Sequence, residues 1–146
     1  MSVSPYLYYE DAAAALDWLA RAFGFEELVR YVDADGVVQE AEMAAGETTI
    51  MLNGAGPGYW RQHGGAGPAG SALVVYVDDV DAHHARATGA GVEAPAPADQ
   101  PYGARVYGAT DPEGHQWYFW QRLRDEVELP EGWREVRIRT PRRPGA

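Results

Sequence analysis

Residues 8–27, YYEDAAAALDWLARAFGFEE, and residues 74–93, VVYVDDVDAHHARATGAGVE, carry two copies of one pattern, and this pattern decides the fold. Sliding the chain against itself by 67 positions aligns six identical residues within 18 positions, from Tyr9 with Tyr76 to Glu26 with Glu93. A repeat of this length is too long for a solenoid unit. It indicates two copies of a supersecondary module that face each other.

The first copy predicts one strand, one helix and three further strands. A helix is expected over residues 11–23, because Asp11 can cap its free amides and Gly24 supplies a left-handed stop. Strands are expected before the helix over residues 5–9, and after it over residues 27–32, 37–44 and 48–53.

The second copy repeats this order after a connection over residues 54–70 that is rich in Gly and Pro and is predicted to be mobile, without regular structure. The expected elements are a strand over residues 72–77, a helix over 79–88, a weak strand near Val92, and strands over 104–108 and 116–121.

The predicted fold class is α+β. Two βαβββ modules, residues 4–53 and 71–121, are expected to form a curved mixed sheet around a cavity, paired within one chain or swapped across a homodimer. They make up a domain over residues 1–121. Residues 122–146 are an Arg-rich C-terminal extension that is predicted to pack in part as an arm and then to be disordered.

Composition excludes several classes of protein. The 146 residues contain no Cys, which excludes disulfides, thiolate zinc sites and a cysteine nucleophile. No apolar run is long enough for a membrane helix, and the N-terminus has no basic leader, so a cytoplasmic protein without membrane contact is expected.

The charge of −10 is unevenly placed, with −12 on residues 1–121 and +2 on residues 122–146. An acidic body disfavours nucleic-acid binding and favours a cationic ligand or partner. The alternative is that this charge serves solubility alone.

The two opening stretches, together with residues 102–119, YGARVYGATDPEGHQWYF, resemble the vicinal oxygen chelate superfamily. This superfamily includes glyoxalase I, extradiol dioxygenases, fosfomycin-modifying enzymes and bleomycin-resistance proteins. The DPEGHQW turn looks most similar to the bleomycin-resistance-like branch. The resemblance implies the paired βαβββ fold, and it leaves the activity open because one fold hosts many chemistries.

The resemblance also places the four metal-ligand positions of the family at Ser4, Met51, Ala72 and Tyr118. A hydroxyl, a thioether, a methyl group and a phenol do not form a ligand set for a divalent metal. Shifting the alignment by one residue does not change this result. We therefore expect no metal, no cofactor and no catalytic residue.

The four histidines offer no catalytic pattern. His83 and His84 are predicted to lie on a solvated helix face, and His63 is predicted to lie on the surface of the connection. His115 follows the DPEG turn and is expected to hold it by bonding a backbone group.

Glu40 and Glu42 lie two residues apart on a predicted strand, so both carboxylates point to the same side. If that side lines the cavity, the pair could supply a general base or an anchor for a cation. If it faces water, the pair only increases solubility.

Alternation along the strands directs several aromatic rings toward the same presumed cavity. Tyr and Trp rings offer rigid stacking surfaces with a polar tip, which suits flat or cationic organic molecules. Ordinary core or dimer packing is the alternative. The expected ligand-binding residues are Tyr6, Tyr8, Glu40, Glu42, Met51, Trp60, Tyr76, Tyr102, Tyr118 and Trp120.

These observations favour a metal-free, dimeric protein that binds a small organic ligand, such as a cationic or aromatic natural product or antibiotic. One alternative is a lyase, isomerase or dioxygenase with an unusual metal set such as Glu40, Glu42 and His115. Another is an interaction module that uses the Arg-rich tail.

Overall fold

Each half of the chain begins with a short strand that leads into a capped helix. The computed structural model describes residues 1–142. In the first half, β1 (Tyr6–Tyr9) leads into α1 (Ala12–Phe23). The Asp11 carboxylate accepts a hydrogen bond of 3.0 Å from the Ala14 amide, and Gly24 ends the helix with φ at 75°. Both predicted caps of this helix are confirmed.

In the second half, β5 (Leu73–Tyr76) leads into α3 (Val80–Gly89). The Asp79 carboxylate caps this helix by accepting from the Ala82 amide, and Gln121 accepts from the Val80 amide. The capping residue lies one position later than the residue that self-alignment pairs with Asp11. The second module therefore has one more residue than the first between its first strand and its helix.

The remaining strands build two sheets of identical order. β2 (Glu26–Val32), β3 (Val38–Ala45) and β4 (Thr48–Gly54) join β1 in the order β1-β4-β3-β2. β6 (Ala98–Asp99), β7 (Ala104–Thr110) and β8 (Gln116–Arg122) join β5 in the order β5-β8-β7-β6. The first strand of each sheet runs parallel to its neighbour, and the other pairs are antiparallel. The predicted α+β fold with two βαβββ modules is confirmed.

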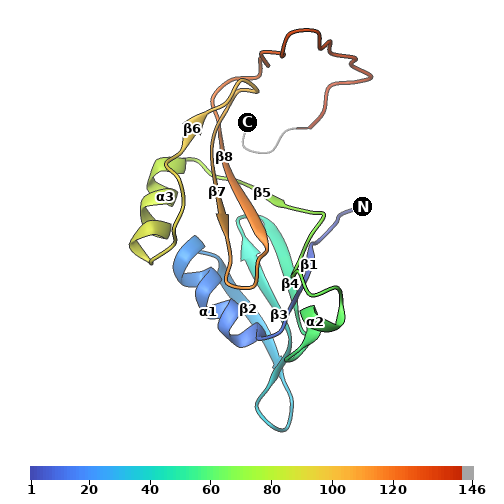
Figure 1. Cartoon of the computed structure of the whole chain (residues 1–146). Helices are drawn as coiled ribbons and strands as arrows, with labels where there is room; N and C mark the ends of the chain where they lie inside the picture. Colours follow the sequence, from blue (N-terminus) through green and yellow to red (C-terminus); the bar gives the residue numbers. More distant parts are fainter. Residues whose placement is uncertain (143–146) are drawn as a thin grey trace.

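One hydrophobic core joins the two modules. α1 packs on β3 and β4, α3 packs on β7 and β8, and the two helices touch each other (Figure 1). The Phe23 ring at the end of α1 lies 4.7 Å from Phe119 and 5.8 Å from Trp117, between ring centroids. Because the helices occupy one face of each sheet, the opposite face of each sheet remains open.

A buried carboxylate at the β7–β8 turn also connects the modules. Asp111 accepts hydrogen bonds from the Tyr9 hydroxyl at 2.7 Å and from the Trp117 indole at 3.2 Å. Its other oxygen accepts from the backbone amides of Glu113 and His115 within the same turn. Burial, followed by the charge of Asp111, raises the pKa of Tyr9 far above its usual value, so its hydroxyl stays a donor.

The same turn holds the start of α1. Glu113 accepts from the backbone amides of Glu10 at 2.6 Å and Asp11 at 3.1 Å. His115 bonds a backbone group as expected, but that group is the Tyr8 carbonyl oxygen at 2.8 Å, in the other module. Its role is therefore to join the modules through the turn.

The connection between the modules is more ordered than its composition predicts. It contains one helical turn, α2 (Tyr59–Gln62). The Trp60 amide donates to Glu10 at 3.0 Å, and the Trp60 indole donates to Glu113 at 2.8 Å. These side-chain contacts over long sequence distances override the local Gly and Pro content.

The strand expected near Val92 is absent from the described residues. Val92 instead donates its amide to the Ala87 carbonyl oxygen and is buried at the end of α3. The fourth strand of the second sheet is β6, which has only two residues and follows Pro95 and Pro97. Because proline has no amide hydrogen to donate, these residues cannot lengthen the hydrogen-bond ladder.

His83 is half-buried, so the prediction of a solvated position was wrong for this residue. Its Nε2 donates to the Phe23 carbonyl oxygen at 2.9 Å, and its Nδ1 accepts from the Tyr107 hydroxyl at 2.6 Å. Its ring stacks 4.1 Å from Phe119. His84 is half-buried as well and bonds the Ala94 carbonyl oxygen at 3.1 Å, whereas His63 is exposed as expected.

The C-terminal extension begins by packing on the β6–β7 loop, through amides of Leu123 and Arg124 that donate to the Gly103 carbonyl oxygen. Residues 123–142 form no helix or strand, and Trp133 and Ile138 are 70% and 90% exposed. Residues 143–146 lie outside the described residues. No helix in the described part of the chain is long and apolar enough to cross a membrane.

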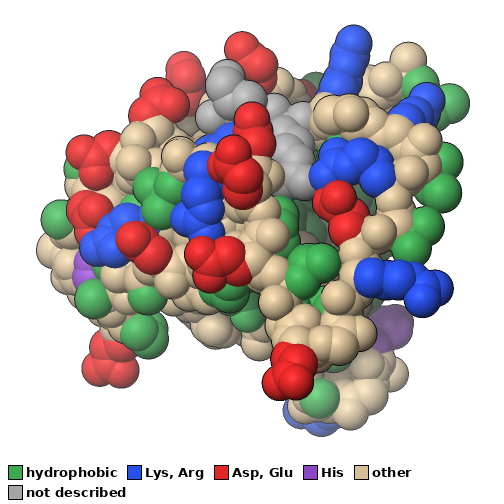
Figure 2. Space-filling view, turned by 90° about the horizontal axis from the view of Figure 1, so that it is seen from above, with side chains coloured by type: hydrophobic (Ala, Val, Ile, Leu, Met, Phe, Trp, Pro, Cys, Tyr) green, Lys and Arg blue, Asp and Glu red, His purple; other side chains and the backbone are tan. Residues whose placement is uncertain are grey.

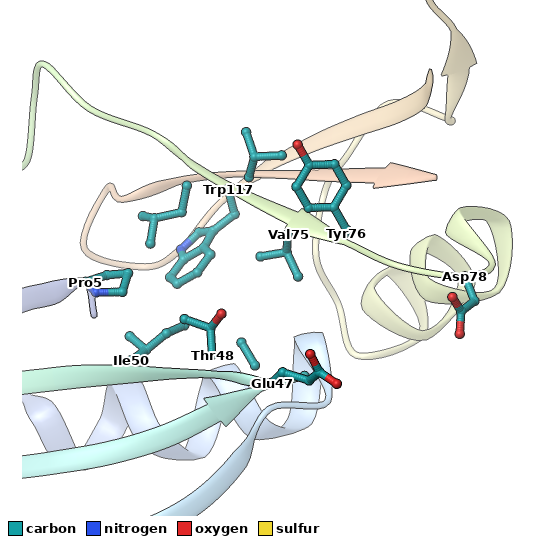
Figure 3. A pocket seen from close by; sticks show the side chains of 12 residues that line it. Pro5, Glu47, Thr48, Ile50, Val75, Tyr76, Asp78 and Trp117 are labelled. Carbon is teal, nitrogen blue, oxygen red and sulfur yellow. The ribbon is translucent and has the colours of Figure 1, made fainter. Parts of the chain in front are cut away.

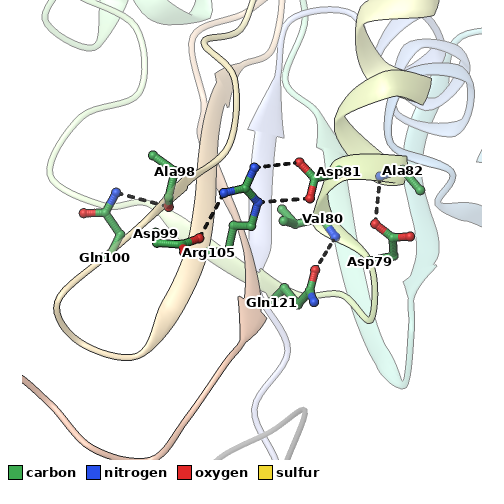
Figure 4. Close-up of polar contacts among 9 residues, drawn as sticks. All are labelled: Asp79, Val80, Asp81, Ala82, Ala98, Asp99, Gln100, Arg105 and Gln121. Carbon is green, nitrogen blue, oxygen red and sulfur yellow. Dashed lines mark hydrogen bonds and ion pairs between the residues drawn. The ribbon is translucent and has the colours of Figure 1, made fainter.

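Charges on the surface are mixed. Figure 2 shows acidic and arginine side chains interspersed over the face seen from above. Arg105 on β7 illustrates how arginines are used: it contacts Asp81 on α3 with two nitrogens at 3.0 Å and Asp99 on β6 at 2.9 Å (Figure 4). This ion-pair cluster ties the short edge strand to the helix.

Tyr9→Phe is expected to lower the free energy of unfolding by about 1–3 kcal/mol, because it removes one donor from the buried Asp111 carboxylate. Tyr31→Phe is the matched control, since Tyr31 is 58% exposed on β2; it should change the unfolding free energy by less than about 0.5 kcal/mol. Urea denaturation measures both. Equal losses in the two variants would contradict the role of Asp111.

His83 is expected to make the protein less stable in mild acid. Burial, and to a smaller extent the charge of Arg86, lowers the pKa of His83 in the folded protein. Below about pH 6.5, the ordinary pKa of a histidine, the unfolded chain therefore binds a proton that the folded chain resists. The free energy of unfolding consequently decreases as the pH is lowered through this range. Between pH 7.5 and pH 5.5, His83→Gln should lose less stability than the wild type. His63→Gln, at an exposed position, should keep the wild-type dependence; identical slopes in all three proteins would refute the assignment.

Candidate ligand-binding site

The open face of the first sheet carries a tyrosine cluster. Tyr6 and Tyr8 alternate outward on β1, and Tyr6 is paired in register with Met51 on β4. The Tyr6 and Tyr8 rings meet edge to face with centroids 5.5 Å apart, and Tyr59 from α2 stacks on Tyr8 at 5.3 Å. The helical turn in the connection therefore extends this aromatic surface.

Glu40 and Glu42 lie on the same open face, on β3, and each is half-buried. Glu40 accepts hydrogen bonds from the Tyr6 hydroxyl at 2.5 Å and the Asn53 amide at 3.0 Å. The bond to Glu40 raises the pKa of Tyr6. Glu40 thus already holds two donors in this structure.

The open face of the second sheet carries a second aromatic cluster. Tyr102, from the turn before β7, stacks on Trp120 of β8 with centroids 4.8 Å apart and planes inclined by 28°. Tyr76 of β5 meets Trp120 edge-on at 6.0 Å. Tyr118 lies over Gly108, where an added Cβ would come within 2.9 Å of the tyrosine ring. A side chain at position 108 would therefore displace Tyr118.

A cleft of about 630 Å³ opens between the two modules (Figure 3). Its volume falls in the range of small-molecule pockets. Trp117, Ile50 and Pro5 give it an apolar interior, and Figure 3 shows Glu47 and Asp78 at one end. The full lining is Pro5, Ala45, Gly46, Glu47, Thr48, Ile50, Leu73, Val74, Val75, Tyr76, Asp78 and Trp117.

Within one chain, the structure divides the predicted ligand-binding residues into two groups. The group on the first sheet contains Tyr6, Tyr8, Glu40, Glu42 and Met51. The group on the second sheet contains Tyr76, Tyr102, Tyr118 and Trp120. Trp60 belongs to neither face, because its indole is bonded to Glu113 at the junction of the modules.

Of the residues that line the cleft, the sequence pattern identifies Tyr76 alone as a candidate ligand-binding residue. Ile50 and Trp117 point to the helix side of their strands, so alternation assigns them to the core. Glu47 sits in a turn and Asp78 next to a helix cap, where acidic residues are common. The repeat is the one signal that could have found them, since it implies a junction between modules.

The residues expected at the family's metal-ligand positions do not supply the usual ligands of a divalent metal. Met51 and Tyr118 lie on the open faces of β4 and β8, and Ser4 and Ala72 precede β1 and β5. None offers a carboxylate, imidazole or thiolate. Within residues 1–142, no three His, Asp or Glu side chains gather as a ligand set. The alternative set of Glu40, Glu42 and His115 does not form such a group in these residues, and the Nε2 of His115 is already bonded to the Tyr8 carbonyl oxygen.

Comparisons with known proteins agree with this architecture. The family model of the Glyoxalase/Bleomycin resistance protein/Dioxygenase superfamily matches residues 3–119. An uncharacterized protein of Mycobacterium bovis is 35% identical over 138 residues, which cover 89% of this chain and 88% of that protein.

Two solved structures are also similar. TioX from Micromonospora sp. ML1 is 34% identical with a TM-score of 0.66, over 84% of this chain and all of TioX (100%). TnmS3 from Streptomyces sp. CB03234 is 25% identical with a TM-score of 0.60, over 84% of this chain and 97% of TnmS3. The chain belongs to the Glyoxalase/Bleomycin resistance protein/Dioxygenase superfamily.

Proposed function

We propose that the protein is a metal-free binding protein that sequesters a small aromatic organic molecule, such as a natural product or antibiotic, without transforming it. The observation that carries the proposal is the stack of Tyr102 on Trp120, flanked by Tyr76, on an open sheet face. Rings held this way form a platform on which a flat ligand can stack. We further propose that the protein acts in the cytoplasm.

The comparisons support a binding role. TnmS3 is described as an antibiotic binding protein, and this chain covers 97% of it. The residues at the metal-ligand positions also favour binding over metal chemistry.

We propose that the working unit is a homodimer in which the open sheet faces of two copies meet around the ligand. Several large side chains on these faces are more exposed than is usual for apolar groups, including Tyr6 at 40% and Val74 at 43%. Exposed apolar patches commonly mark interfaces or ligand sites. A dimer would also bring the two groups of candidate residues to one site, which a single chain does not do.

Acidic side chains lie on the first open face and at one end of the cleft. The first face carries Glu40 and Glu42, and the cleft has Glu47 and Asp78 at one end. These carboxylates favour a ligand that places a cationic group on the first face or at that end of the cleft. Glu42 is the better anchor on the first face, because Glu40 already accepts from Tyr6 and Asn53.

Titration calorimetry of the full chain against glycopeptide, enediyne and planar aromatic antibiotics tests the proposal. At least one class should bind, and Trp120→Leu should weaken it about three- to ten-fold through lost stacking. Trp133→Leu is the matched control, since Trp133 is 70% exposed in the tail and should leave affinity unchanged. Binding by no compound, or equal weakening by both variants, would refute the binding proposal.

Light scattering of the full chain tests the proposed homodimer and should report the mass of a dimer.

Metal analysis distinguishes binding from the enzyme alternative. After dialysis against a chelator, the purified protein should contain far less than one zinc, iron, manganese or nickel per chain, and adding these ions should not raise its melting temperature. Retention of a stoichiometric metal would instead favour a lyase, isomerase or dioxygenase.

A further inference from the structure

Arg122 brings a positive charge onto the aromatic face of the second sheet. It ends β8 two residues after Trp120, so its side chain leaves the strand on the same side. Its guanidinium carbon lies 5.7 Å from the centre of the Tyr76 ring, within the range of a cation–π contact. The stacked pair of Tyr102 and Trp120 is thus bordered by a cation.

The Nε atom of Arg122 is buried and has no hydrogen-bond partner, and it is the one such side-chain atom found in the described part of the chain. A buried donor without an acceptor is costly, more so when it is charged. Arg105 on the neighbouring strand shows the contrast, because its nitrogens contact Asp81 and Asp99. The chain has 22 acidic residues, yet none is placed to accept from this nitrogen.

Movement of Tyr102 off the face of Trp120, on which it stacks, would open a slot for a planar group beside Arg122. Trp120 provides a wall, Tyr76 flanks it edge-on, and Tyr102 covers it from a turn closed by the Gly103 amide and the Gln100 carbonyl oxygen. Tyr102 belongs to a loop, so it can move more readily than a strand residue. A ring that entered this slot would bring its substituent close to the guanidinium.

We propose that Arg122, together with Tyr76, Tyr102 and Trp120, forms a subsite for a planar aromatic ligand that carries a carboxylate. The ring stacks on Trp120, and a carboxylate oxygen accepts from the Arg122 guanidinium. This inference rests on the proposed binding function and specifies its ligand class. It assigns opposite charge preferences to the two open faces: cation toward Glu42 on the first, anion toward Arg122 on the second.

The net charge of −10 does not oppose this assignment. At physiological salt, charges in solvent are screened beyond about 8 Å, so the acidic groups elsewhere act weakly on the slot. A guanidinium in direct contact with the ligand dominates at that distance. The local cation therefore determines the preference of the subsite.

The test compares naphthalene-2-carboxylate with 2-naphthamide, which have the same ring and similar shape but differ in charge. Calorimetry with the full-length wild type should show the acid binding at least about ten-fold more tightly than the amide. Arg122→Met should abolish this preference while changing affinity for the amide less than about three-fold, and Arg122→Lys should keep part of it. Arg137→Met is the matched control, because Arg137 lies in the exposed tail next to Glu135; it should bind as the wild type does.

The outcomes separate the two proposals. Equal wild-type affinity for acid and amide, or equal loss of both in Arg122→Met, would overturn the subsite and leave the binding function standing. If neither naphthalene binds, the aromatic-acid inference is overturned, and the antibiotic panel judges the binding function by itself. Circular dichroism checks the fold of each variant; if Arg122→Met does not fold, the wild-type comparison of the two probes still decides.

Discussion

The buried carboxylate of Asp111 is the interaction on which the rest of the structure depends. One oxygen accepts from Tyr9 of the first module and Trp117 of the second, and the other oxygen holds the β7–β8 turn in shape. With the turn fixed, Glu113 reaches the amides at the start of α1 and the indole of Trp60. A buried charge is tolerated only when its hydrogen bonds are satisfied. The relative placement of the two modules follows from meeting that condition.

Joining the modules in this way determines where the molecule can bind something. The helices α1 and α3 and the helix-facing sides of both sheets build one core. The outward faces of the sheets are left, and each carries tyrosine or tryptophan rings beside charged groups. Glu40 and Glu42 mark the first face and Arg122 marks the second. The proposed binding surfaces are therefore sheet faces, whose side chains alternate at fixed spacing along backbone ladders.

The fold could be predicted from sequence because its signals are local. Asp11 and Gly24 mark the ends of α1, and the repeat implies a second copy of the same order. Alternation also identifies the residues that share a face, such as Tyr6 with Tyr8. Local patterns of this kind do not indicate how deeply a side chain is buried or which distant residues it contacts. His83, for example, is predicted to face solvent, but it bonds Phe23 of the first module and Tyr107 of the second. The order of the connection depends on Trp60 reaching Glu10 and Glu113, and the environment of Arg122 depends on Tyr76. Contacts between residues far apart in sequence carry no local pattern.

The two-residue length of β6 has a consequence for self-association. β2 covers β3 over most of its length, whereas β6 pairs only with Arg105 and Val106. Among residues 1–142, no strand therefore pairs with the outer edge of β7 beyond Val106. Exposed strand edges are templates for fibril growth. Pro95 lines a shallow pocket with Gly108 and Thr110 beside that edge, and Pro97 follows closely in sequence. Residues without an amide hydrogen cannot extend a ladder, so this proline-rich segment disfavours the addition of a further strand along the uncovered part of β7.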